Sequence, residues 1–439
     1  MAELFDDLVS SAAPSRREPG QARLRLPVRD EPSFQVCDLD ALISDDHPAR
    51  LIWAYASRVD LSALEARVKA RAGEPGMPQT SLHLLLGLWL YATTRGVGSA
   101  RELARLCAGE TAFRWLCGGV GVNHRLLSEF RAHQGGLVGR LLAEHVASLS
   151  VAGAIDLDEI AQDGVRVRAN AGASSFRRRK TLEGELAKAK DLVERLAKDE
   201  SDDPGASDKR AKAARERAAR EREARVGAAL AALGEAEKLR EKRLKTNKAQ
   251  AQKQKEPRAS TTDPEARVMK MADGGFRPAY NVQFASLPEN GIIVAVSCET
   301  TGSDRGLAEP MAQAIEAAYG VRAKAHLADG GYNSGEDIEA AAKAGTAFHC
   351  PPVKSKSGRD PFEPREDDSA ALKDWRARMA SEDGKDAYKR RARCELVHAK
   401  FRNLGLDHVL LRGKEKVATW MRWFALASNI LTAARLQVA

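Results

Sequence analysis

Residues 177–258 constrain the fold more than any other stretch of the sequence, because they contain no Phe, Tyr or Trp. The stretch has 25 Lys and Arg against 16 Asp and Glu. It therefore carries the whole net charge of +9, since the rest of the chain has 45 residues of each sign. Without large apolar groups it cannot build a core of its own. We expect a solvated basic insert that divides a globular chain in two.

Within this insert, leucines recur at sparse helical spacing among Ala, Glu, Lys and Arg, and Pro204-Gly205 interrupts the run. This pattern predicts two long helices in an antiparallel, coiled-coil-like hairpin. Two roles stay open for the hairpin: a solvated spacer, or an element that contacts the DNA backbone. The lack of aromatic residues argues against stacking on single-stranded bases.

The remaining composition describes a globular chain of 439 residues, 43% of them hydrophobic. No window approaches the roughly 18 consecutive apolar residues of a membrane span, and the start of the chain lacks the layout of a secretory signal. The six cysteines and nine histidines show neither zinc-ligand spacing nor a disulfide framework. We predict a cytoplasmic protein with reduced thiols and no membrane contact.

The chain before the insert divides into two parts. Residues 1–33 are polar and Pro/Arg-containing, which predicts a poorly ordered leader. Residues 34–151 show short helical segments joined by tight turns, which fits a helix-turn-helix-like DNA-binding domain with Arg125 and Arg131 exposed on its last helix. An ordinary helical bundle fits the same pattern equally well.

Residues 152–176 and 259–439 read as one mixed α/β domain with a single central sheet. Apolar and polar residues alternate around Asp163-Gly164, which predicts a strand or hairpin. A hairpin then follows around 288–291, and beyond it helices alternate with short strands. Long helices are expected over 388–404 and 417–436.

Three carboxylates stand out in this domain. Asp163 is predicted at the tip of the first strand region, Asp329 at the end of a later strand before two glycines, and Glu395 on a helix. Strand ends of an α/β sheet gather at one edge, where ligands usually bind. Together the three acids could hold two divalent cations about 4 Å apart for phosphodiester chemistry. Oxygen ligands favour Mg²⁺ or Mn²⁺, although any one of these acids taken alone could be a solvated surface group.

The predicted helix over 388–404 strengthens this hypothesis. Tyr388, Arg391, Glu395 and Arg402 are spaced by three, four and seven residues, which places all four on one helix face with His398 nearby. An arginine one turn from a metal-binding carboxylate can bind phosphate oxygens bidentately. A solvated helix face is the simpler alternative.

These residues resemble the DDE transposases of bacterial insertion sequences, one branch of which carries the signature Tyr-x2-Arg-x3-Glu-x6-Lys. Here the segment reads Tyr388-Lys-Arg-Arg391-Ala-Arg-Cys-Glu395-Leu-Val-His-Ala-Lys-Phe-Arg402, with Arg402 in place of the family's Lys. Further similar segments follow in the family's order: Phe113-Arg-Trp-Leu, Asp163-Gly-Val-Arg, Ser260-Thr-Thr-Asp-Pro, Tyr280-Asn-Val-Gln, Asp329-Gly-Gly-Tyr and Arg412-Gly.

The resemblance implies an RNase H-like core in which Asp163, Asp329 and Glu395 bind the metal ions. It also implies that Tyr388, Arg391 and Arg402 bind phosphates near the scissile bond. The expected reaction is cleavage of double-stranded DNA at terminal inverted repeats, followed by attack of the 3′-hydroxyl on target DNA. A homodimer or larger assembly, associated with the bacterial nucleoid, would bridge two ends. Two alternatives stay open: a non-catalytic repeat-binding protein derived from a transposase, and a plain RNase H-like nuclease.

Overall fold

The computed structural model describes residues 38–436 except 69, 71–76, 199–205, 247–255 and 354–357. The predicted leader, residues 1–33, and the Pro204-Gly205 interruption lie outside the described residues. No helix in the described part of the chain has the length and apolar character needed to cross a membrane.

The N-terminal region is helical, as predicted, and its helices begin at polar capping residues. The Ser81, Ser99 and Asn123 side chains each accept a hydrogen bond from a backbone N–H of the first turn of the helix that follows, which begins at Leu82, Ala100 and His124 respectively. The helices are α1 (Pro48–Ala56), α2 (Ser62–Glu65), α3 (Leu82–Thr94), α4 (Ala100–Gly109), α5 (Thr111–Cys117), α6 (His124–His133) and α7 (Gly135–Val151).

A six-stranded mixed sheet follows, which confirms the predicted mixed α/β class. The central strand β5 (Phe276–Ser286) pairs antiparallel with β1 (Glu159–Arg168) on one edge. On its other edge the first part of β5 pairs with β4 (Arg267–Lys270) and the later part with β6 (Ile293–Glu299), both antiparallel. Beyond β1 the sheet turns parallel, through β7 (Ala325–Ala328) and β8 (Ala347–His349). The predicted hairpin around 288–291 joins β5 and β6.

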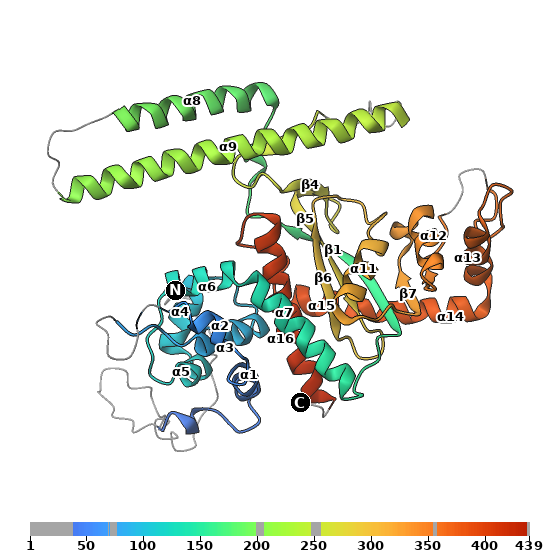
Figure 1. Ribbon diagram of the computed structural model, residues 1–439, viewed down its shortest axis with the longest axis horizontal. Coiled ribbons are helices and arrows are strands. Elements are labelled where there is room, and N and C mark those ends of the chain that lie inside the picture. Colours follow the sequence, from blue (N-terminus) through green and yellow to red (C-terminus); the bar gives the residue numbers. More distant parts are fainter. Residues whose placement is uncertain are drawn as a thin grey trace, which may run out of the picture.

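Four helices pack against strands of this sheet (Figure 1): α11 (Ala308–Tyr319), α12 (Gly335–Lys343), α14 (Glu382–Arg390) and α15 (Cys394–Asn403). Helix α13 (Ala370–Ala380) was not predicted from the sequence. A second core of buried side chains lies beside β8 and includes Tyr332, Phe348, Trp375 and Met379.

The C-terminal helix α16 (Lys414–Arg435) joins the helical region to the sheet. It lies between them in Figure 1 and packs against α3 and α7 as well as β6. Its Trp420 meets Trp89 of α3 edge-on, and its Phe424 meets Phe284 of β5. One continuous hydrophobic core therefore contains side chains from both regions.

The burial of Arg131 corrects the sequence-based prediction that this residue is exposed on α6. Its guanidinium lies 4.5 Å from the ring centre of Trp89 and 5.2 Å from that of Trp420, and it donates to the carbonyl of Gly98. Only 4% of Arg131 is exposed. The cation stabilises the packing between α3, α6 and α16, whereas Arg125 is exposed on the same helix.

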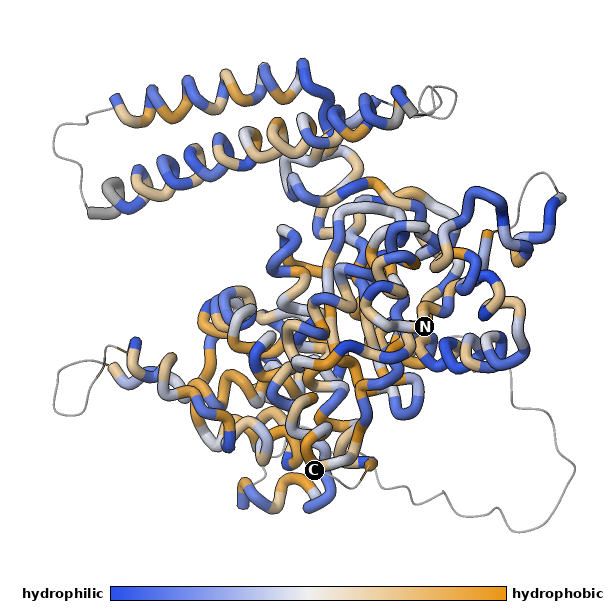
Figure 2. Tube along the Cα trace, turned by 45° about the vertical axis from the view of Figure 1, so that its right-hand side comes forward, coloured by the Kyte–Doolittle hydropathy of each residue, from blue (hydrophilic) through white to orange (hydrophobic). Residues whose placement is uncertain are grey.

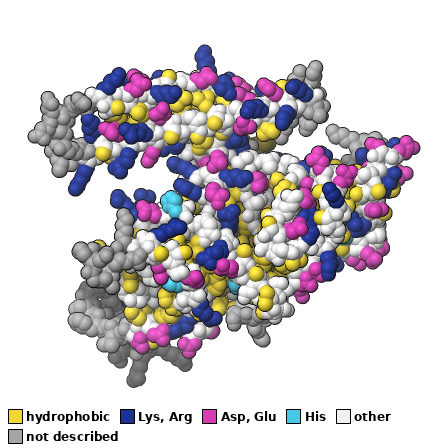
Figure 3. All heavy atoms as spheres, in the orientation of Figure 1, with side chains coloured by type: hydrophobic (Ala, Val, Ile, Leu, Met, Phe, Trp, Pro, Cys, Tyr) yellow, Lys and Arg dark blue, Asp and Glu magenta, His cyan; other side chains and the backbone are white. Residues whose placement is uncertain are grey.

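The insert forms the predicted pair of helices, α8 (Arg179–Lys198) and α9 (Ala206–Thr246), which lie side by side and apart from the main body (Figures 1 and 2). Their contact is a small apolar cluster that includes Leu182, Val226 and Leu233. Lys and Arg alternate with Asp and Glu over the visible surface (Figure 3). The two-stranded ribbon of β2 (Phe176–Arg177) and β3 (Ala259–Ser260) connects the insert to the body.

Candidate active site

The first two acids are brought together by the pairing of β1 with β7. These strands run parallel, and their register ends at Gln162 opposite Ala328. The residue directly after each member of this last pair is an aspartate: Asp163 within β1 and Asp329 just beyond the end of β7. The two aspartates are therefore neighbours where β7 ends. The location of Asp163 differs from the prediction: it lies in the middle of β1, not at its tip. The strand continues because its other edge stays paired with β5 as far as Arg168.

Arg391 brings the third acid into the cluster. One guanidinium nitrogen, Nη2, lies 3.1 Å from Asp163 Oδ2 and 3.9 Å from Asp329 Oδ2. The other, Nη1, lies 3.8 Å from Glu395 Oε1. The side chains of Arg391 and Asp163 are each 14% exposed, while that of Glu395 is 70% exposed. All three predicted acids thus surround one arginine, and Glu395 reaches it from the solvent side.

The predicted continuous helix over 388–404 is wrong. Helix α14 ends at Arg390, a 3₁₀ turn covers Arg391–Arg393, and α15 begins at Cys394. A 3₁₀ turn winds more tightly than an α-helix, so the four residues of the signature do not form a single α-helical stripe. Tyr388 is half-buried against the second core, and Arg402 is exposed one turn beyond His398.

The electrostatics of the cluster are set by burial and by like charges. Desolvation raises the pKa of Asp163 to about 6; Arg391 opposes this shift, and the carboxylates of Asp329 and Asp304 add to it. His398 Nδ1 lies 3.6 Å from Asp163 Oδ2. Burial, together with the charges of Arg402 and Arg391, lowers the pKa of His398 to about 4, so this imidazole is neutral near pH 7. Arg391 is therefore the cation that compensates Asp163.

Asp304 is an acid of this site that the sequence did not reveal. Its Oδ1 accepts hydrogen bonds from Asn281 Nδ2 at 2.7 Å and Gln283 Nε2 at 2.9 Å, and its Oδ2 accepts one from Arg166 at 2.8 Å. Polar residues at alternate positions of a buried strand, Asn281 and Gln283, were the available signal. The loop position of Asp304 offered none.

Gly164 explains how this polar layer approaches β1 so closely. A Cβ at this position would lie 2.4 Å from Gln283 Nε2 and 2.7 Å from Asp304 Oδ1. A side chain would therefore displace the layer, and glycine is required by the close approach. The tyrosine of the Asp329-Gly-Gly-Tyr segment completes the layer, because the buried Tyr332 hydroxyl donates to Gln283 Oε1.

The chemistry of the acids suits divalent metal ions, although no group of three His, Cys, Asp or Glu among the described residues is already arranged as a metal site. Asp163, Asp329 and Glu395 supply the carboxylate oxygens that Mg²⁺ and Mn²⁺ prefer. Burial, and to a smaller degree the like charges of Asp329 and Asp304, raise the pKa of Asp163, and a bound cation would stabilise its ionised form. The donor set thus fits the ions predicted from the sequence.

Fold and site together define a class of protein: a mixed α/β domain with a carboxylate cluster at the edge of its sheet, joined to a helical domain. Residues 241–430 match the family model of the transposase DDE domain, and residues 37–133 match that of transposase domain DUF772. The chain is thus similar to a transposase DDE domain over its second half and to a second transposase domain over its N-terminal helical region. The first match contains Asp329 and Glu395 and begins after Asp163, within α9. Comparisons with curated proteins and with solved structures gave no significant match.

Proposed function

We propose that the protein is an active transposase that cuts double-stranded DNA at the ends of an insertion sequence and joins the 3′-hydroxyl ends to target DNA. The observation that carries this proposal is the convergence of Asp163, Asp329 and Glu395 on Arg391. Three acids distant in sequence thus meet around one cation and offer the carboxylate oxygens that two-metal chemistry uses. An order of antiparallel and then parallel strands around β1 supports an RNase H-like core.

The three acids would hold two Mg²⁺ or Mn²⁺ ions. Such ions activate the attacking oxygen and stabilise the leaving oxygen in phosphodiester chemistry. Arg391 would exchange its contacts with the carboxylates for a phosphate oxygen near the scissile bond, since its planar guanidinium binds both groups. Tyr388 and Arg402 would bind neighbouring phosphates. The neutral His398 would restrict the freedom of the Asp163 carboxylate without adding charge.

DNA recognition would fall to the helical region, residues 34–151. Arg125 is exposed on α6 and is available for a phosphate or base contact. Cutting two ends in one event calls for at least two protomers, so a homodimer or larger assembly on DNA, associated with the bacterial nucleoid, is part of the proposal.

The test is cleavage of DNA that carries the sequence flanking the protein's own gene, in the presence of Mn²⁺. We expect breaks at a discrete position, mapped at the 3′ ends. Asp163→Asn keeps the shape of the side chain and removes its charge, so cleavage should fall by at least about a thousandfold, several kcal/mol of barrier, while DNA binding is retained. Asp329→Asn and Glu395→Gln should behave alike. Cleavage that survives in all three variants would remove these acids from the site.

The same experiment distinguishes an active transposase from the non-catalytic repeat-binding protein. That alternative is favoured by one observation, the compensation of the acids by Arg391. Specific binding to the flanking repeats, with no breaks even when both ends are supplied, would identify a repeat-binding protein. Breaks without joining of the 3′ ends to a second DNA would identify a plain nuclease.

A further inference from the structure

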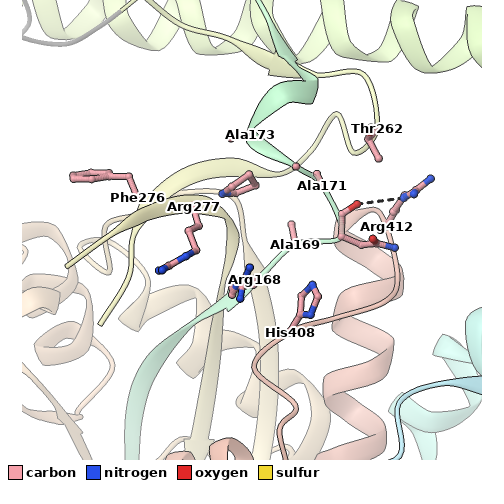
Figure 4. Close-up of a pocket in the computed structure, with 12 residues that line it drawn as sticks. Arg168, Ala169, Ala171, Ala173, Thr262, Phe276, Arg277, His408 and Arg412 are labelled. Carbon is pink, nitrogen blue, oxygen red and sulfur yellow. Dashed lines mark hydrogen bonds between the residues drawn. The ribbon is translucent and has the colours of Figure 1, made fainter. Parts of the chain in front are cut away.

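A basic pocket of about 510 Å³ lies at the base of the insert, away from the carboxylate cluster (Figure 4). Its walls come from the end of β1 and the segment that leads to the insert, from the start of β5, and from the loop before α16. Twelve residues line it: Arg168, Ala169, Asn170, Ala171, Gly172, Ala173, Thr262, Phe276, Arg277, Pro278, His408 and Arg412. They include three arginines, one histidine and no acid.

Two of the three guanidinium groups have donors to spare. Arg277 is paired with Asp273 at 2.6 Å. Toward the described residues Arg412 donates from its Nε alone, to the Asn170 carbonyl at 3.3 Å. The Arg168 side chain makes no hydrogen bond or ion pair within the described residues and is exposed. The pocket therefore presents guanidinium N–H donors with no carboxylate of the described chain hydrogen-bonded to them in Arg168 and Arg412, and such donors bind phosphate oxygens.

The backbone around these arginines is firmly held. Arg168 N donates to Asp407 O at 2.7 Å, and Val409 N donates to Arg168 O at 3.0 Å. Asn170 Nδ2 donates to Leu410 O at 2.8 Å. Because both segments are fixed before a ligand arrives, binding there loses little backbone conformational entropy. At the rim, Phe276 is 71% exposed and its ring points outward, an unusual position for an aromatic side chain (Figure 4).

The distance between the pocket and the acid cluster can be estimated along β1, because this strand carries both Asp163 and Arg168. Arg168 lies five residues after Asp163 on β1, which is about 17 Å at roughly 3.3 Å per residue. Phosphates of one DNA strand are about 3.4 Å apart along the helix axis. A duplex with its scissile phosphate at Asp163 extends well beyond the distance from Asp163 to Arg168, so another part of its backbone can reach the pocket.

We propose that this pocket is a second phosphate-binding site for the duplex, in which Arg168 and Arg412 hold the DNA backbone away from the cleavage point. The proposal rests on the proposed function, since it needs DNA at the acid cluster. In this proposal the residues at the base of the insert position the DNA. That role is separate from any contact that α8 and α9 make with DNA.

The test compares the full-length protein with the double variant Arg168→Gln/Arg412→Gln, using duplex DNA of the flanking sequence at several salt concentrations. Each lost phosphate contact lowers the slope of log affinity against log salt by about 0.9, so the slope should become shallower by about 1.8. At about 0.1 M salt the affinity should fall by tens of fold. Arg365→Gln/Lys373→Gln, exposed residues near α13, removes the same charge elsewhere and should keep the wild-type slope.

Phosphate ethylation then locates the contact. Ethylating the phosphates one at a time should reveal a position, separate from the mapped break, where the modification weakens wild-type binding and leaves the double variant unaffected. A double variant that retains the wild-type slope overturns the pocket proposal, as does a change seen only with single-stranded DNA. If the wild-type protein binds no DNA, the proposed function itself fails. Equal thermal unfolding temperatures exclude misfolding as the cause.

Discussion

Helices α16 and α9, the two longest helices of the described chain, are held in opposite ways. Fourteen of the 22 residues of α16 are buried, and its aromatic side chains pack against both the helical region and the sheet. Among the described side chains of the 41-residue α9, the buried apolar ones are Ala219, Val226, Ala229 and Leu233. The difference lies in composition, because an aromatic-free helix can bury little apolar area against a single neighbour.

This contrast has a consequence for how the molecule unfolds. Since α16 contributes to a core that both regions share, the helical region and the sheet should unfold in one cooperative transition. The insert depends on its own small cluster and should open separately. The absence of Phe, Tyr and Trp from 177–258 provides a natural probe, because intrinsic fluorescence reports on the body alone while far-UV circular dichroism reports on both.

The largest effect is expected for Trp423→Ala in α16. Trp423 is fully buried and its ring meets that of Phe130 at 6.1 Å. Loss of the ring should lower the free energy of unfolding by about 3–5 kcal/mol. In urea, fluorescence and limited proteolysis should report the loss for the helical region and the sheet at the same denaturant concentration. Two separate midpoints would contradict the shared core.

Leu233→Ala should affect the insert alone. Leu233 is fully buried between α8 and α9, so its truncation should destabilise the hairpin by about 2–3 kcal/mol. We expect faster amide exchange in α8 and α9 with an unchanged fluorescence transition. Leu239→Ala is the matched control on the same helix, because Leu239 is 56% exposed. A lowered fluorescence midpoint in Leu233→Ala would mean that the insert and the body are coupled.

Elements of the fold and site that depend on local sequence could be predicted, whereas those that depend on contacts between distant parts of the chain could not. Local patterns predicted the insert hairpin, the strands β5 to β8 and the last helix, because each has a clear period or turn signal. The break at Arg391–Arg393 carries neither Gly nor Pro. Helix α13 did carry a signal, because Leu372, Trp375 and Met379 lie at helical spacing after the capping residue Ser369. Arg131 is buried by Trp420, which lies far along the chain, so its location depends on tertiary packing alone.

The buried arginine provides the next comparison, Arg131→Met against Arg125→Met on the same helix. Removing the Arg131 guanidinium leaves the Gly98 carbonyl without its partner and the Trp89 and Trp420 rings without their cation. We expect a loss of about 1–3 kcal/mol of stability with DNA affinity retained. Arg125→Met should leave stability within about 0.5 kcal/mol and weaken DNA binding. Reversed outcomes would restore Arg131 as a DNA contact.

The smallest effect on stability is expected for removal of the insert itself. Arg177 and Ala259 are paired across the β2–β3 ribbon, so residues 178–258 can be replaced by an Asn-Gly turn that closes a hairpin. Ser260 and Asp263 stay, because Ser260 Oγ accepts from the Asp263 N–H and Asp263 accepts from the Tyr280 hydroxyl inside the body. The fluorescence midpoint should then remain within error of the wild type.

The same deletion decides the role of the insert in DNA binding. If α8 and α9 contact phosphates, their removal should weaken binding and flatten its salt dependence by about 0.9 per lost contact. A wild-type slope would establish the hairpin as a spacer. Adding Arg168→Gln/Arg412→Gln to the deletion separates the insert from the pocket at its base, because contacts that are independent should lower the slope by the sum of their separate effects.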